Sequence, residues 1–363
     1  MLSRIALLCP LLALAFAQAG LAQGTSEKEV RDVFQQLVAV PGVSFHEDKV
    51  LEKIKQLLPG NVKPVIDDMN NLTVTLGTGT PEIMFVAHMD EIGLEVTAIN
   101  EDGTLRTTGR GGFFTTIWES KVVKVQTKKG IVDGIIGPRK NYQDATPAEH
   151  SRDDLIVYVG TDSKAATEAL GISPGDFIVQ PKRITQMGRY KSAAGSTDDR
   201  GGCTAQLLAL RRLAGKPLNK TVAFAFVVQE ETGLSGSGHI AKTLAPKYVV
   251  AVDTFVSSDA PFDVKNIGYT PLGKGAVIRA FDSASITPED VCLRIRKIAE
   301  ARKIPVQWGI TSGGSDASVF LQEGSVAIPL SWPGIYSHSY VSVMDIRDLI
   351  ALTDLIVAIS ESF

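Results

Sequence analysis

The chain has 363 residues, of which 44% are hydrophobic, so it is long and apolar enough to bury the core of one large domain or two. Its formal net charge is −3, from 37 basic and 40 acidic side chains. That balance excludes a broad basic surface for nucleic acid, because binding to phosphates requires clustered positive charge.

Residues 1–22 have the pattern of a secretory signal peptide. Arg4 precedes an apolar run over residues 5–17, which is too short to span a bilayer, and small residues follow it. The alternative is a buried N-terminal helix. The pattern predicts an exported protein, periplasmic or secreted, that has no membrane segment after cleavage. The two cysteines that remain, Cys203 and Cys292, are expected to be buried free thiols, although an exported chain could pair them.

Two helices are predicted next. Apolar side chains recur with helical spacing over residues 30–38, and Pro41 follows that run. Ser44 and Glu47 have the spacing of a capping box, which predicts that a second helix begins there and covers residues 50–58. Strands are then predicted at 72–76 and 83–87.

The composition changes between residues 94 and 185. Short β-type runs alternate with turn dipeptides such as Asp102-Gly103 and Pro174-Gly175. The clearest of these runs cover residues 122–126, 131–136, 155–159 and 177–179. We interpret residues 94–185 as a small all-β barrel inserted into a catalytic domain formed by residues 23–93 and 186–363.

Helices and apolar strands alternate again after the insert. The pattern predicts helices at 203–213 and 286–301 and strands at 222–228, 248–252 and 326–330. Ser342 and Asp345 are expected to cap a closing helix. The predicted fold class is therefore α/β, with a mixed, mostly parallel sheet sandwiched by helices, as in zinc exopeptidases, and an inserted β barrel.

Metal-ligand side chains follow the predicted strands. His88 comes directly after the apolar run at 83–87, at the carboxyl end where open α/β sheets bind ligands. Asp90 is placed to hold the other ring nitrogen, although a histidine satisfied at a strand end is the alternative. Asp198 and Asp199 precede a helix, so either could cap its N–H groups or bridge two metal ions.

Two adjacent carboxylates, Glu230 and Glu231, end the buried strand at 222–228. They repel each other, so either a positive group lies beside them or the segment is a solvated turn. A metal ion would let one act as ligand and the other as general base. Asp253 ends the next predicted strand, and His338 lies in a segment that otherwise lacks charge. The remaining histidines have no strand before them and are interpreted as surface residues: His46, His150 and His239.

Six segments occur in one order along the chain: AHMDEIG, TDDRGGC, VVQEETGLSG, VAVDT, SGGSDAS and IYSHS. Together they resemble the glutamyl aminopeptidase and tetrahedral (TET) aminopeptidase family of dizinc exopeptidases, some members of which are labelled endoglucanases. The resemblance implies two metal sites that share one aspartate, namely His88, Asp198 and Asp253 in one and Asp198, Glu231 and His338 in the other. It also implies that Glu230 is the general base, that Asp90 orients His88 and that the loop with Asp316 lies beside the substrate.

The activity implied by the resemblance is removal of N-terminal residues from peptides. Two divalent ions, zinc or else cobalt or manganese, would supply a metal-bridged hydroxide as the nucleophile, and Glu230 would accept the proton. The expected partners are peptides with a free N-terminus. The resemblance further implies a homo-oligomer, from a dimer to a tetrahedral dodecamer, formed through the β insert.

Three other functions have to be weighed against this one. Related dizinc carboxypeptidases and deacylases share the ligand order, but their extra domain lies between the fourth and the last ligand, whereas here it lies between Asp90 and Asp198. A non-catalytic metal-binding relative would not need Glu230. Glycoside hydrolysis would use a carboxyl pair without metal.

The sequence departs from the family just after the last predicted ligand. His338-Ser339 is followed by Tyr340, Val341 and Ser342, where the family usually has a proline and, soon after, a glutamate. The departure leaves the predicted ligands intact and bears on the wall of the pocket.

Overall fold

The computed structural model describes residues 24–146, 151–266 and 268–363. The predicted signal peptide and His150 lie outside these ranges. Within them, no helix has both the length and the apolar composition needed to cross a membrane.

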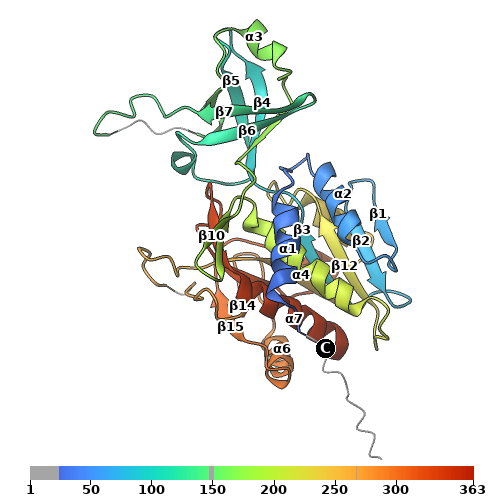
Figure 1. The fold of residues 1–363 in the computed structure, drawn as a ribbon. Coiled ribbons are helices and arrows are strands. Elements are labelled where there is room, and N and C mark those ends of the chain that lie inside the picture. Colours follow the sequence, from blue (N-terminus) through green and yellow to red (C-terminus); the bar gives the residue numbers. More distant parts are fainter. Residues whose placement is uncertain (1–23, 147–150, 267) are drawn as a thin grey trace, which may run out of the picture.

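A mixed sheet of twelve strands forms the larger part of the molecule (Figure 1). Its strands are β1 Pro64–Ile66, β2 Leu72–Leu76, β3 Ile83–His88, β10 Thr185–Met187, β11 Lys191–Ala194, β12 Val222–Val227, β13 Tyr248–Val256, β14 Ala276–Phe281, β15 Val306–Ile310, β16 Val326–Ala327, β17 Leu330–Ile335 and β18 Ser342–Asp345. The main order is β1-β2-β12-β3-β13-β17-β18-β11-β10. The central strands β12, β3, β13 and β17 are parallel, so their carboxyl ends meet at one edge.

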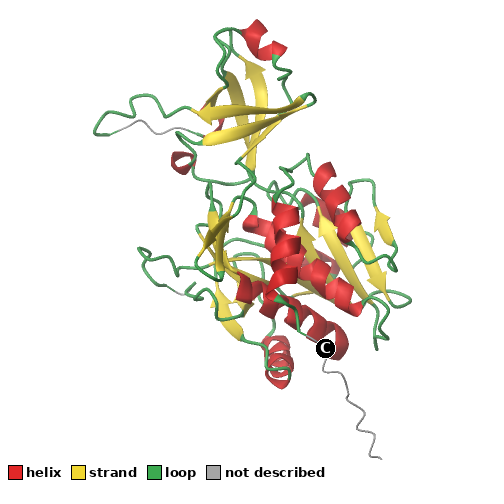
Figure 2. Cartoon of the chain, viewed as in Figure 1, coloured by secondary structure: helices red, strands yellow, loops and turns green. Residues whose placement is uncertain are grey.

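Helices cover both faces of this sheet (Figure 2). They are α1 Glu27–Val38, α2 Asp48–Leu57, α4 Thr197–Leu213, α5 Ser235–Ala241, α6 Glu289–Ala301, α7 Ile346–Ser362 and the 3₁₀ helix η3 Asp316–Glu323. Strand β3 shows why two layers form: Phe85 packs into the core under α1, α4 and α7, whereas Met84 and Val86 pack under α5 and η3. A strand buried on both faces reads as a continuous apolar run, as the sequence does here.

Residues 93–179 contain a closed barrel of six strands in the order β4-β5-β8-β7-β6-β9. The strands are β4 Gly93–Ile99, β5 Leu105–Arg110, β6 Val122–Thr127, β7 Gly130–Ile136, β8 Ile156–Tyr158 and β9 Phe177–Val179; the short helices are η1 Thr115–Ile117, η2 Arg152–Asp154 and α3 Lys164–Ala169. The barrel has its own apolar core, in which Trp118 is fully buried. The predicted α/β fold class with an inserted β barrel is confirmed.

Buried charges link the two segments that connect the sheet to the barrel, residues 89–92 and 180–184. Glu91 lies on the outgoing segment, and its carboxylate accepts a hydrogen bond from Lys182 on the returning segment. The guanidinium of Arg200, which is fully buried, lies 3.5 Å from the same carboxylate and also donates to the carbonyl of Met89. Arg200 therefore links the start of α4 to both connecting segments.

Two predicted caps are wrong. Helix α2 begins at Asp48 without a side-chain cap, because Ser44 and Glu47 hydrogen-bond to residues far away in sequence. The closing helix begins later than predicted: Ser342 lies in strand β18, and Asp345 alone caps α7 by accepting from the backbone N–H of Arg347. Cys203 and Cys292 are buried free thiols, as predicted.

Candidate metal centre

The five predicted metal ligands meet at the carboxyl edge of the parallel strands. They come from the end of β3, the first turn of α4, the loop after β12, the middle of β13 and the loop between β17 and β18: His88, Asp198, Glu231, Asp253 and His338. A cavity of about 330 Å³ opens there, and its lining includes His88, Asp198, Asp253 and His338 together with Glu230.

Asp198 lies between the two histidines, and each of its carboxylate oxygens faces one of them. Oδ1 is 3.3 Å from Nε2 of His88, and Oδ2 is 3.6 Å from Nε2 of His338. Asp253 Oδ1 is 3.9 Å from Nε2 of His88, and Glu231 Oε2 is 3.7 Å from Nε2 of His338. The side chains thus form two groups of three ligand atoms, each within 4.8 Å of one another, that share Asp198.

Asp198 and Asp199 divide the two roles that the sequence left open. Asp199 Oδ1 accepts from the backbone N–H of Gly202 at 2.9 Å, which caps the helical part of α4. Asp198 faces the histidines, and Ser337 Oγ donates to its Oδ2 at 2.9 Å. A Cβ at Gly202 would lie 2.3 Å from the carbonyl oxygen of Val252, so glycine is needed where α4 meets β13.

Asp253 does not follow the end of its strand as predicted. Strand β13 continues to Val256, because it pairs in parallel with β17 from Val252 onward. The carboxylate therefore reaches the cavity from inside the sheet.

Asp90 is fully buried and hydrogen-bonds the groups around His88. Its carbonyl and its Oδ1 lie 3.2 and 3.3 Å from Nδ1 of His88. Its carboxylate also accepts from the backbone N–H groups of Glu230 at 3.1 Å and Glu231 at 3.2 Å, and from Ser44 Oγ at 2.6 Å. One carboxylate therefore links the imidazole to the loop that carries both glutamates.

Two more buried residues hold that loop. Glu47 Oε1 accepts from the backbone N–H of Gln229 at 3.0 Å. Asn71 Oδ1 accepts from Val228 N at 3.0 Å, and its amide donates to Gly236 O at 3.1 Å. Each of these groups would be costly to leave unpaired in the interior, so the loop is fixed from both sides.

Carboxylates are crowded in this centre. Burial raises the pKa of Glu230 and of Glu231 well above their usual range, and it raises the pKa of Asp253 to about 7. The neighbouring carboxylates add to each shift, because like charges in a desolvated site repel one another. Imidazole and carboxylate donors in this number fit divalent metal ions, whose charge would offset the repulsion.

The barrel supplies part of the site, which the sequence did not predict. The carbonyl oxygen of Gly112 lies 2.6 Å from Nδ1 of His338. Phe114, although 73% exposed, lines the cavity. The signal in the sequence is the run Gly111-Gly112-Phe113-Phe114 at the end of a β hairpin, where two glycines let the backbone approach closely.

Arg279 is another lining residue that the sequence analysis missed. It is 3% exposed on β14 and donates to the carbonyl of Thr254 at 2.7 Å and to that of Gly314 at 3.3 Å. A single arginine within the apolar run AVIRAF is the signal that indicates it. Gly314 belongs to the loop before Asp316, which is 3% exposed and whose Oδ1 has no hydrogen-bond partner among the described residues.

The other described histidines lie away from these groups. His239 Nε2 is 2.8 Å from Asp68 Oδ1 near the molecular surface. His46 and His239 are both half-buried rather than on the surface as predicted, with side chains that are 26% and 32% exposed. The His46 ring stacks on Phe177 at 4.7 Å, and its Nε2 lies 3.2 Å from Glu95 Oε2.

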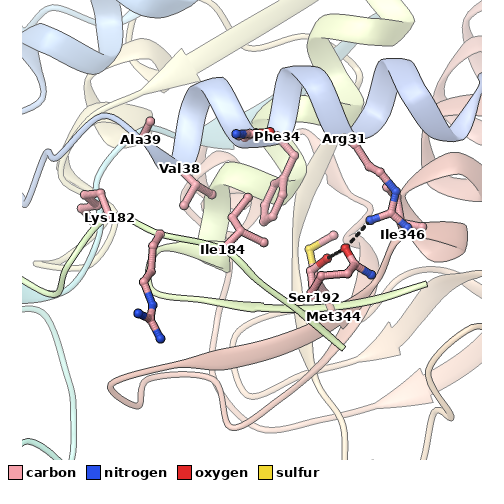
Figure 3. A pocket seen from close by; sticks show the side chains of 12 residues that line it. Arg31, Phe34, Val38, Ala39, Lys182, Ile184, Ser192, Met344 and Ile346 are labelled. Carbon is pink, nitrogen blue, oxygen red and sulfur yellow. Dashed lines mark hydrogen bonds between the residues drawn. The ribbon is translucent and has the colours of Figure 1, made fainter. Parts of the chain in front are cut away.

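A second hollow, of about 460 Å³, lies between α1 and strands β10, β11 and β18 (Figure 3). Phe34, Val38 and Ile184 form much of its apolar wall, and Arg31 and Lys182 also line it. No predicted ligand is among its lining residues in the described part of the chain. The metal centre is therefore a separate cavity.

The family model described as M42 glutamyl aminopeptidase matches residues 70–355, which include all five predicted ligands. The chain belongs to the M42 glutamyl aminopeptidase family. It is 28% identical over 336 residues to the glutamyl aminopeptidase of Lactococcus lactis, covering 89% of this chain and 93% of that one. It is 29% identical over 334 residues to the lysyl aminopeptidase of Pyrococcus furiosus, covering 88% and 93%.

A solved structure of the Pyrococcus horikoshii TET1 peptidase is similar over 93% of this chain and 100% of that one, with 36% identity and a TM-score of 0.84. The family match and these relatives show that the chain is a metallo-aminopeptidase that uses divalent metal. The predicted resemblance and enzyme class are confirmed.

The comparisons correct one part of the predicted function. The sequence suggested an exported enzyme, but M42 TET aminopeptidases are typically cytosolic, and the matched relatives give no support for export. The prediction of an exported aminopeptidase is therefore wrong.

Proposed function

We propose that this M42 enzyme holds two divalent ions and removes N-terminal residues from peptides. The observation that supports two ions is that the two carboxylate oxygens of Asp198 face different histidines, His88 and His338. Asp253 completes one ligand group and Glu231 the other. When bound, such an ion pair lowers the pKa of a shared water and polarises a carbonyl oxygen. The donors suit zinc best, with cobalt or manganese as substitutes.

Glu230 is the proposed general base. It belongs to neither of the two groups that share Asp198, and its Oε2 is 3.9 Å from Nε2 of His88 inside the same cavity. Its backbone is held by Asp90. From that position its carboxylate accepts the proton of the attacking water and returns it to the amine that leaves. Asp90 keeps His88 oriented throughout.

One carboxylate in the cavity remains for a free N-terminus. Glu230 lines the cavity without belonging to either group of proposed ligands that share Asp198, so its negative charge attracts the protonated α-amine of a peptide. Phe114 and Val256 offer apolar surface at the mouth for the first side chain of a substrate. The named relatives act on residues of opposite charge, glutamyl and lysyl, so no side-chain preference is transferred to this chain.

Blocking the substrate amine tests this assignment. Aminoacyl-anilides with a free amine are expected to be cleaved with a kcat/KM about 10 to 100-fold higher than their N-acetylated counterparts, because a charged hydrogen-bonding group contributes about 1.5–3 kcal/mol. The measurement is initial rate across a panel of both forms with zinc, cobalt or manganese added. Equal release of aniline from the acetylated substrates would show that the free amine is not required, and release of acetate instead would favour a deacylase.

Removing the metal is expected to abolish activity and to lower stability. Each ion that binds only the folded chain stabilises it by about 2.7 kcal/mol at 100 times its Kd, and the repulsion between carboxylates returns when it leaves. Activity, metal content and Tm are measured before and after chelation, and again after metal is restored. Full activity in protein shown to lack metal would exclude a metal-dependent reaction.

We also propose that the chain forms a homo-oligomer through its barrel, between a dimer and a dodecamer. The Pyrococcus horikoshii relative can assemble into a tetrahedron or a large octahedral shell. On this chain three exposed apolar residues stand in register on neighbouring barrel strands: Val122, Ile135 and Tyr158. A row of that kind is suited to an interface between subunits.

A further inference from the structure

Of the five proposed ligands, His338 is the one whose side chain the main domain holds least. It lies in the loop between β17 and β18, and its side chain is 41% exposed, whereas that of His88 is 2% exposed. The hydrogen bond at its ring goes to the barrel, at Gly112 O. A carbonyl can only accept, so Nδ1 carries the hydrogen and Nε2 is left as a lone-pair donor facing Asp198 and Glu231.

Tyr340, two residues further along the same loop, also contacts the barrel. Its hydroxyl donates to the carbonyl of Val122, and its ring stands edge-on to Trp118 with centroids 5.7 Å apart and an angle of 86°. Lys121 Nζ lies 5.8 Å from the centre of the Tyr340 ring. The ring packs against the apolar core of the barrel, in which Trp118 is fully buried.

Both contacts are made to one stretch of the barrel, residues 111–122. The same stretch approaches the second glutamate: a Cβ at Gly111 would lie 3.1 Å from Cβ of Glu231. The loop is thus fixed on either side of Ser339, by the Gly112 carbonyl at His338 and by the aromatic contact at Tyr340. A proline at position 340 would offer neither the hydroxyl nor the aromatic ring.

We propose that Tyr340 is a positioning residue for His338, through which the barrel sets the ligand geometry of the metal group that contains Asp198, Glu231 and His338. The inference rests on the proposed role of His338 as a ligand. Holding Tyr340 against Trp118 restricts the loop, so the imidazole is oriented before an ion binds. The other group, built from His88, Asp198 and Asp253, has no member in this loop.

Metal affinity tests the proposal apart from activity. Full-length protein is freed of metal and titrated with Co²⁺, followed by calorimetry and by the visible absorption of the bound ion. Tyr340→Ala is expected to weaken one of the two binding events by about 10 to 100-fold, the cost typical of losing an outer partner of a ligand, and to leave the other near the wild-type value. Tyr340→Phe keeps the ring, and its affinity for the weakened ion is expected to lie between those of Tyr340→Ala and wild type.

Two controls separate positioning from general damage. Tyr142→Ala removes an exposed tyrosine to which no role at the metal centre or the subunit interface is assigned, and it is expected to change neither event. In a His338→Ala background, adding Tyr340→Ala is expected to lower metal affinity no further, because the imidazole that Tyr340 positions is absent. Circular dichroism checks that each variant is folded.

The outcomes are distinct. A Tyr340→Ala protein that binds both ions as tightly as wild type would overturn the inference alone, and so would an equal loss in Tyr142→Ala or an undiminished loss in the His338→Ala background. A wild-type chain that binds no ion would overturn the proposed function together with it.

Discussion

Replacing Glu230 with glutamine is expected to lower kcat by about 10²–10⁴-fold, the range usual for loss of a general base. The amide has nearly the same shape, and the backbone N–H of residue 230 still donates to Asp90, so the loop keeps its position. The measurement is kcat on an aminoacyl-anilide, with metal content determined on the same sample. Metal content is expected to remain at the wild-type value.

Glu231→Gln is the matched control, since the two carboxylates are neighbours and both are largely buried. This variant should lose the ion grouped with His338, because its Oε2 faces Nε2 of that histidine at 3.7 Å. Both variants are needed because the ligand atoms of His88, Glu230 and Glu231 also lie within 4.8 Å of one another, so either glutamate could bind metal. If Glu230→Gln loses metal while Glu231→Gln keeps it, the two roles are exchanged.

Replacing Asp198 with asparagine is expected to weaken binding of both ions, each by more than about 100-fold. Loss of an outer partner already costs 10–100-fold in metal affinity, and this residue is the proposed direct ligand of both ions. The neutral amide also removes one negative charge and one of the two acceptor oxygens that face His88 and His338. Activity should fall with the metal, and calorimetry together with metal analysis measures both losses.

Asp253→Asn provides the comparison for this prediction. Asp253 belongs only to the group with His88, so its variant is expected to lose one ion and retain the other. A single lost ion in Asp198→Asn, equal to the loss in Asp253→Asn, would show that the aspartate does not bridge.

The predictions from sequence succeeded where a local pattern decides the structure. The apolar run before His88 is a strand buried on both faces, so its length located the strand end at the histidine. The prediction that the strand ends just before Asp253 was wrong because pairing with β17 extends β13 beyond the carboxylate, and a polar residue within a strand resembles a strand end in the sequence. Ser44 and Glu47 have capping-box spacing, yet their partners are Asp90 and Gln229, which lie in other segments.

The sequence by itself determined the types and order of the proposed ligands and the alternation of apolar strands and helices, because these are read from short segments of the chain. Only the tertiary structure decided that Asp198 presents one oxygen to each histidine and that the barrel contacts the loop of His338, through Gly112 at the histidine and Trp118 at Tyr340. Gly112 and His338 are 226 positions apart. Contacts over such a separation arise from the packing of sheet and barrel, which leaves no periodic trace in the sequence.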